Sequence, residues 1–202
     1  MKSTPRFRHD LITGNPPRIP PLKPSEISKE LLAAHNQLRK AVSLPPADEV
    51  PEFTATMFRH PGLYESHMAF SLKLFHGALA PRDRELAVLR VAWLCQAPYA
   101  WGEHVRIGKQ LAGLTDDEVA RVTVGSTAPE WHERDRAILQ AVEEMHADAM
   151  ISETTWTILS NSLNEKQLIE LPLLVGQYQG TAYLQNSFRS RLAAGNSGLY
   201  AR

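Results

Sequence analysis

The chain has 202 residues, of which 43% are hydrophobic, so it can bury a sizeable core within one large domain. Basic and acidic residues number 22 each and no block of like charges occurs, which excludes the electrostatic footprint of a protein that binds nucleic acid or an anionic membrane. The single cysteine excludes an intrachain disulfide and a zinc site built from thiolates.

The first 24 residues are rich in proline, which fixes the backbone dihedral φ and removes a hydrogen-bond donor. We expect residues 1–24 to form an extended arm rather than a regular helix. The prolines of this segment are Pro5, Pro16, Pro17, Pro20, Pro21 and Pro24. This start, M-K-S-T-P-R-F-R-H-D, also lacks the apolar stretch of a signal peptide.

Residues 25–192 show the three- and four-residue spacing of apolar side chains that is typical of helices, and no segment predicts a strand. Ser25 is a plausible cap for the first helix, and three prolines mark 44–51 as a linker. Further helices are expected over 61–77, 81–95, 98–111, 115–122, 130–148, 152–162 and 165–187. The glycine-, serine- and asparagine-rich residues 193–202 are predicted to form a flexible tail.

The longest apolar runs of these helices fall well short of the roughly 20 residues that a membrane-spanning helix needs. We therefore expect a soluble, cytoplasmic protein.

Two of the expected helices begin with a capping box, in which the first residue and the one three positions later satisfy each other's backbone N–H groups. The pairs are Thr115 with Glu118 and Asn164 with Gln167. The sequence R-D-R occurs at 82–84 and again at 134–136, each time at the start of an apolar helix. A unit of paired helices that occurs twice would favour an all-α packing.

One histidine interrupts an apolar row. On a helix that starts at Ala97 or Pro98, His104 shares a face with apolar residues and should be at least partly buried. On the preceding helix, Glu85 shares a stripe with Val88, Leu89 and Ala92, a costly position for a carboxylate without a partner. An acid and an imidazole on adjoining helices suggest that the two groups stabilise each other.

Two interpretations of this pair stay open. Ideal antiparallel helices offset Glu85 from His104 by roughly 8 Å along the axis, so direct contact needs an oblique crossing, a water or a second subunit. Alternatively, His104 bonds a backbone carbonyl and Glu85 bonds an arginine or a helix end, and both serve structure alone. On the helix that carries His104, the opposite face, with Tyr99, Glu103 and Arg106, is expected to point to solvent.

Three motifs within residues 81–122 carry a family resemblance: R-D-R-E-L-A-V-L-R-V-A-W, Y-x-W-x-x-H-V and G-L-T-D-D-E-V. Together they resemble the carboxymuconolactone decarboxylase family, which is related to the alkylhydroperoxidase AhpD proteins. Weaker similarity extends from Phe53 to the sequence L-V-G-Q-Y at 174–178. The resemblance implies an all-α, AhpD-like helical bundle that forms a homo-oligomer, a trimer or a hexamer, and uses no cofactor.

The peroxidase branch of this family has a glutamate nineteen residues before a histidine, with C-x-x-C between them. Glu85 and His104 match these two positions, but Ala97 and Ala100 replace both cysteines. Peroxide reduction by that route needs a thiolate and a resolving thiol. Cys95 lies two residues too early, at the end of an apolar helix, where we expect it to pack in the core.

The resemblance then implies a cofactor-independent lyase that removes carbon dioxide from a small carboxylated or lactone substrate of aromatic catabolism. Glu85 and His104 would be the catalytic pair, with His104 as the proton donor. Tyr99 and Trp101 would shape the substrate site. The decarboxylase branch commonly has Y-E-W before the histidine, whereas here Ala100 takes the place of the acidic residue.

Two other functions stay open: an antioxidant that uses Cys95 alone, and a non-catalytic oligomeric protein that binds a small molecule. Arg84 and Arg106 are both candidates for holding a substrate carboxylate. No metal site is expected. Glu143 and His146, one helical turn apart, come nearest to a ligand pair but fit an exposed helix face better.

Overall fold

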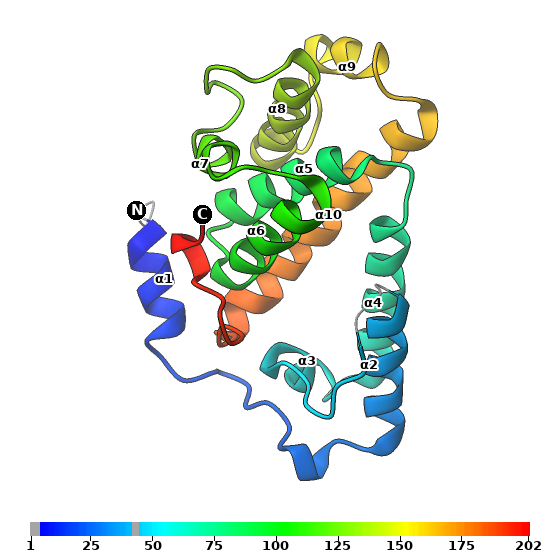
Figure 1. Ribbon diagram of the computed structural model, residues 1–202, viewed down its shortest axis with the longest axis vertical. Coiled ribbons are helices and arrows are strands. Elements are labelled where there is room, and N and C mark those ends of the chain that lie inside the picture. The colour runs from blue at the N-terminus through cyan, green and yellow to red at the C-terminus, as the bar shows by residue number, and fades with distance from the viewer. Residues whose placement is uncertain (1–4, 42–44) are drawn as a thin grey trace.

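The computed structural model describes residues 5–41 and 45–202, and over these residues the chain is helical without a strand (Figure 1). The helices are α1 (Pro5–Thr13), α2 (Lys29–Ala41), α3 (Glu52–Met57), α4 (Pro61–Phe75), α5 (Pro81–Leu94), α6 (Pro98–Ala112), α7 (Asp116–Val124), α8 (Glu133–Asp148), α9 (Glu153–Ser160) and α10 (Glu165–Phe188), with 3-10 turns η1 (Pro24–Glu26) and η2 (Gly198–Tyr200). The predicted all-α fold is confirmed. Residues 1–4 of the expected arm and residue 44 of the expected linker lie outside the described residues.

Helix α5 lies at the centre of the bundle. Pro81 occupies its first turn, where the missing N–H breaks no helical hydrogen bond. Every residue from Asp83 to Ala92 is buried, because α6, α7, α8 and α10 pack around this helix (Figure 1). Since a helix buried on all sides cannot leave its polar side chains to water, those of α5 need partners within the protein.

The two R-D-R motifs join α5 to α8. Arg82 Nη2 lies 2.8 Å from Asp135 Oδ2, and Arg134 in turn binds Asp83. The first arginine of each motif thus forms an ion pair with the aspartate of the other motif. This reciprocal pairing is what two related helix units would produce when they pack face to face.

Both predicted capping boxes are present. Thr115 Oγ1 accepts a hydrogen bond from the Glu118 N–H at the start of α7, and Asn164 Oδ1 accepts one from the Gln167 N–H at the start of α10. Helix α10, with 24 residues, is the longest. Neither it nor any other helix within the described ranges is long and apolar enough to cross a membrane.

A second, smaller hydrophobic cluster lies apart from the main core. Phe53, Met57, Phe58 and Tyr64 bring α3 and α4 together, and apolar residues of α2 pack against them. Figure 1 shows α2 and α4 side by side, and Gln177 of α10 donates hydrogen bonds to His67 and Ser71 of α4. The sequence does not predict α3, because its six residues are too few for a periodic signal. The candidate site forms where the two clusters face each other.

The amino-terminal segment differs from the expected extended arm. Residues Pro5–Thr13 form α1, because Pro5 stands in the first turn and the next proline is Pro16, which leaves space for about two helical turns. The first helix of the main domain also begins later than predicted. Ser28, not Ser25, accepts a hydrogen bond from the first turn of α2, at 3.3 Å from the Leu31 nitrogen.

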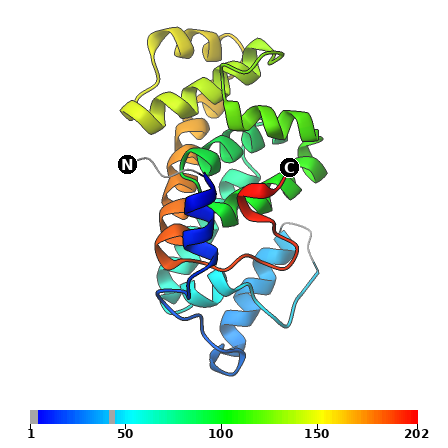
Figure 2. The same ribbon diagram turned by 90° about the vertical axis from the view of Figure 1, so that its left-hand side faces the viewer.

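The carboxy-terminal segment also differs from the expected flexible tail. Leu199 is buried, and Trp101 Nε1 donates a hydrogen bond to the Ala201 carbonyl at 3.1 Å. His9 packs edge-on against Tyr200, so α1 and η2 lie side by side on one face of the fold (Figure 2). The glycine and serine content of residues 193–202 does not predict this contact, because the hydrogen-bond acceptor of the buried indole is a backbone carbonyl, which composition does not reveal.

Candidate active site

Glu85 on α5 and His104 on α6 meet directly. Oε2 of Glu85 lies 2.8 Å from Nδ1 of His104. Glu85 is fully buried and His104 is only 9% exposed. The structure therefore joins the predicted pair within one subunit, without a bridging water.

The position of Gly108 shows how Glu85 and His104 are offset along α6. A Cβ added to Gly108 would lie 3.7 Å from the Cβ of Glu85, so Glu85 lies level with Gly108, one turn beyond His104. That distance is an ordinary van der Waals contact; the neighbour that an added Cβ would crowd is Leu114, with Cδ1 at 2.9 Å. The length of the glutamate side chain covers the offset from His104.

Arg84 holds the second carboxylate oxygen of Glu85. Its Nε donates to Oε1 at 3.0 Å, and its Nη1 donates to the Phe75 carbonyl at 2.8 Å. Burial raises the pKa of Glu85, but the charges and hydrogen bonds of His104 and Arg84 outweigh burial and lower this pKa below its usual value of 4.5. Glu85 is therefore ionised near neutral pH.

The ionised carboxylate sets the orientation of His104. A carboxylate only accepts hydrogen bonds, so Nδ1 of His104 must carry the shared proton. Nε2 is then the ring nitrogen left for other chemistry, and it has no hydrogen-bond partner among residues 5–41 and 45–202. Tyr178 of α10 packs edge-on against the imidazole, with 4.9 Å between the ring centroids. Burial, reinforced by the Glu85 charge, raises the pKa of Tyr178, so its phenol stays protonated.

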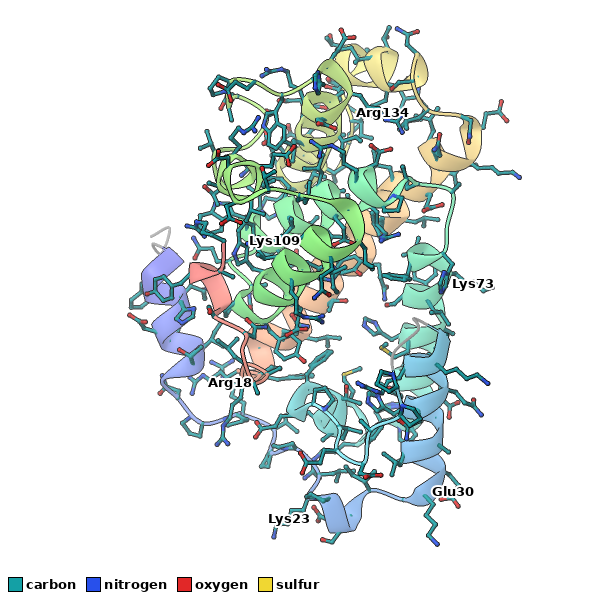
Figure 3. The ribbon with its side chains drawn as sticks, in the orientation of Figure 1. Arg18, Lys23, Glu30, Lys73, Lys109 and Arg134 are labelled. Atoms are coloured by element: carbon teal, nitrogen blue, oxygen red, sulfur yellow. The ribbon has the colours of Figure 1, made fainter. Side chains whose placement is uncertain are left out.

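His104 and Tyr178 line an open cavity of about 470 Å³ between the two hydrophobic clusters. Helices α2, α3 and α4 form one wall, and α6 and α10 form the other; Figure 3 shows side chains directed into the space between them. The lining is largely apolar, with Leu38, Met68, Leu72, Phe75, Ile107 and Leu111. A cavity of this size with a few polar groups fits a small organic ligand.

Neither Tyr99 nor Trp101 lines this cavity, although both were candidates for shaping the substrate site. Trp101 shares the stripe of His104 but lies one turn earlier, where the segment around Ala201 covers the helix. Tyr99 is half-buried rather than facing solvent, because it packs against Phe53 with 5.9 Å between the ring centroids. The cavity instead meets α6 at His104 and beyond it.

The two arginines considered for a substrate carboxylate are already engaged. Arg84 is buried beside Glu85 and does not line the cavity. Arg106 does line the cavity, but its Nη2 lies 3.2 Å from Glu103 and its Nη1 donates to Gln110 at 3.1 Å. Neither arginine therefore offers the cavity a charge that lacks a partner.

Three polar residues on the opposite wall were not predicted: His35 and Arg39 of α2 and Tyr64 of α4. Their sequence signal is weak. His35 and Arg39 are four residues apart and so share one helix face. However, that face lies beside α4 and lines a cavity whose other wall comes from α6 and α10. Periodicity does not identify neighbours so far away in the sequence.

Cys95 has the surroundings of a packed thiol. It ends α5, is partly buried against the main core and does not line the cavity. Burial, opposed in part by Arg8, raises the pKa of Cys95 to about 11. The described part of the chain therefore places no thiolate beside His104.

Cys95 should react slowly with thiol reagents in the folded protein. A rise in its pKa from 9.0 to about 11 lowers the thiolate fraction near neutral pH about a hundredfold. We expect iodoacetamide to alkylate the folded protein at least that much more slowly than the same protein in urea, as followed by mass spectrometry. Equal rates in the two states would show that the thiol is reactive in the fold.

Several solved structures share this fold. The alkylhydroperoxidase AhpD core of a peroxidase-related protein from Ralstonia eutropha JMP134 aligns with a TM-score of 0.74 and 15% identity, over 89% of this chain and 94% of that chain. A peroxidase-related protein from Silicibacter sp. TM1040 gives 0.72 and 16%, over 91% and 97%. The debrominase Bmp8 gives 0.68 and 15%, over 88% and 92%. The fold is thus AhpD-like, and its acid and imidazole meet without a neighbouring thiol.

A family model also matches part of the sequence. Residues 61–144 match the model of the carboxymuconolactone decarboxylase family, and this segment contains both Glu85 and His104. No curated protein matches the chain significantly. The match agrees with the family resemblance that the motifs of residues 81–122 carry.

Proposed function

We propose that the protein is a cofactor-independent lyase that removes carbon dioxide from a small carboxylated or lactone substrate of aromatic catabolism. The observation that supports this most is the 2.8 Å contact between ionised Glu85 and His104 at the wall of a largely apolar cavity. The match of residues 61–144 to the carboxymuconolactone decarboxylase family model supports the class of reaction. The absence of a thiol beside His104, among the residues described, speaks against the peroxidase alternative.

In this reaction the bond between the substrate carbon and its carboxylate breaks, and the electron pair moves into a conjugated carbonyl of the substrate. Protonated His104 gives its Nε2 proton to the carbon left behind and keeps its Nδ1 proton on Glu85. Glu85 acts through His104, because its negative charge stabilises the imidazolium before the transfer. The apolar walls strengthen this interaction by lowering the local dielectric constant. Solvent then restores the proton on Nε2.

A relative of the same fold takes up a small ring compound. A cysteine-to-alanine variant of the debrominase Bmp8, 16% identical to this chain with a TM-score of 0.68, has been solved in complex with 2,3,4-tribromopyrrole. The cavity in this chain, between α2, α4, α6 and α10, supports a ligand of comparable kind. A planar ring could pack between the apolar side chains of the two walls.

Release of carbon dioxide tests the proposal. Purified protein is incubated with carboxymuconolactone and with a panel of related unsaturated lactone carboxylates. We expect carbon dioxide in proportion to substrate consumed, at the same rate with and without a metal chelator. No release from any member of the panel would refute the proposed lyase, and binding without release would favour the non-catalytic binding protein.

We also propose that the chain forms a homo-oligomer. Helix α10 exposes an apolar row, Ile169, Leu173 and Tyr183, on the same face as Gly176 and Gly180. A continuous exposed apolar row is typical of a contact surface. Light scattering should give the mass of a trimer or a hexamer rather than that of the 22.6 kDa chain. A monomer at micromolar concentration would contradict this expectation.

A further inference from the structure

The wall of the cavity formed by α2 carries two polar residues that the proposed reaction does not use. His35 and Arg39 both line the cavity, and they lie opposite His104, which α6 contributes from the other wall. Figure 1 shows α2 beside α4. Helix α2 (Lys29–Ala41) also lies outside the segment that matches the family model, residues 61–144. The family match therefore implies nothing about these two residues.

His35 is a buried imidazole with one nitrogen left over. The residue is 8% exposed, and its Nδ1 lies 3.5 Å from the hydroxyl of Tyr64, a long hydrogen bond. Its Nε2 is buried and has no hydrogen-bond partner among the described residues. Buried polar atoms are nearly always paired. The His35 ring lines the cavity, so a turn of the ring would let a ligand there supply the partner that Nε2 lacks.

Arg39 brings a positive charge to the same wall. Its Nε donates to the Pro45 carbonyl at 2.7 Å, and no carboxylate pairs with its guanidinium within residues 5–41 and 45–202. The other charged groups on the cavity are matched, since Arg106 pairs with Glu103 and His104 with Glu85. Burial, followed by the nearby charge of Arg39, lowers the pKa of His35, so its ring is neutral and can donate or accept one hydrogen bond at Nε2.

We propose that His35 and Arg39 form an anion subsite, which holds a carboxylate that the substrate keeps throughout the reaction. The guanidinium of Arg39 supplies the charge, and Nε2 of His35 supplies a directed hydrogen bond. The substrate is then an apolar ring compound with two functional ends, one that reacts at His104 and one anchored at α2. This inference rests on the proposed function only in treating the cavity as the substrate site.

The test measures binding without turnover, using benzoate and its neutral counterpart benzamide as probes. We expect isothermal titration of the unmodified protein to show about tenfold tighter binding of benzoate, the usual effect of one charge-assisted hydrogen bond. Arg39→Gln and His35→Leu should each remove most of that preference. Two matched variants should keep it: Arg59→Gln, whose Nε also donates to a proline carbonyl but which does not line the cavity, and His146→Leu, an exposed histidine on α8. Arg106→Gln tests the other arginine of the cavity. Circular dichroism verifies that each variant is folded.

Three results would overturn the subsite: no binding of benzoate by the unmodified protein, a preference that survives in both Arg39→Gln and His35→Leu, or a preference that only Arg106→Gln removes. These outcomes are separable from failure of the lyase proposal. Selective benzoate binding through Arg39 without any carbon dioxide release would leave the subsite standing and refute the lyase. Carbon dioxide release with an unchanged KM in Arg39→Gln would instead support the lyase and refute the subsite.

Discussion

Replacing His104 with asparagine should lower kcat/KM for carbon dioxide release by about 10²–10⁴-fold, the range that a positioned proton donor contributes. The amide nitrogen of asparagine can occupy the place of Nδ1 and still donate to Glu85, so the buried carboxylate keeps a partner and the fold is retained. The side chain has no group equivalent to Nε2 that can release a proton. The measurement is the rate of release from the best substrate of the lactone panel.

The control for this variant is His146→Asn, which makes the same exchange at an exposed position on α8. It should leave kcat/KM unchanged. If His104→Asn releases carbon dioxide at the normal rate, His104 is not the proton donor and the cavity reacts by another route.

Local signals in the sequence predicted much of the helical fold. Pro61, Pro81 and Pro98 each begin a helix where expected, because proline is tolerated in a first turn. The capping boxes at Thr115 and Asn164 depend on residues only three positions apart, and both are present. The segments whose structure differs from the expectation depend on contacts with distant parts of the chain instead. The carboxy-terminal turn η2 is ordered by contacts with α6 and α1, and no local pattern encodes these contacts.

The same distinction explains the site. Glu85 and His104 belong to consecutive helices, so spacing places them near each other, but their direct contact across one helical turn is seen only in the structure. The cavity itself was not predictable, because its walls come from helices far apart in the chain. For the same reason, the sequence does not reveal that Trp101 lies off the cavity and that His35 lines it.

Replacing Glu85 with alanine should lower the free energy of unfolding by about 3–5 kcal/mol, the usual cost of removing one partner from a buried ion pair. Arg84, 5% exposed, and His104, 9% exposed, would both lose the carboxylate that they share. Glu85→Gln should cost less, because the amide oxygen still accepts one hydrogen bond and no cavity forms. Urea unfolding near neutral pH measures both variants. Equal stability of all three proteins would show that the buried contact contributes nothing.

The pH dependence of these stabilities separates charge from packing. Because the pKa of Glu85 is lowered below 4.5 in the folded protein, the folded state binds this proton less tightly than the unfolded state does. The stabilisation is therefore complete above the unfolded pKa and is lost as the pH falls through the folded pKa. We expect the difference in unfolding free energy between the natural protein and Glu85→Gln to be largest near neutral pH and to shrink below pH 4.5. A difference that stays constant down to acidic pH would mean that the packing of the Glu85 side chain, not its charge, stabilises the folded protein.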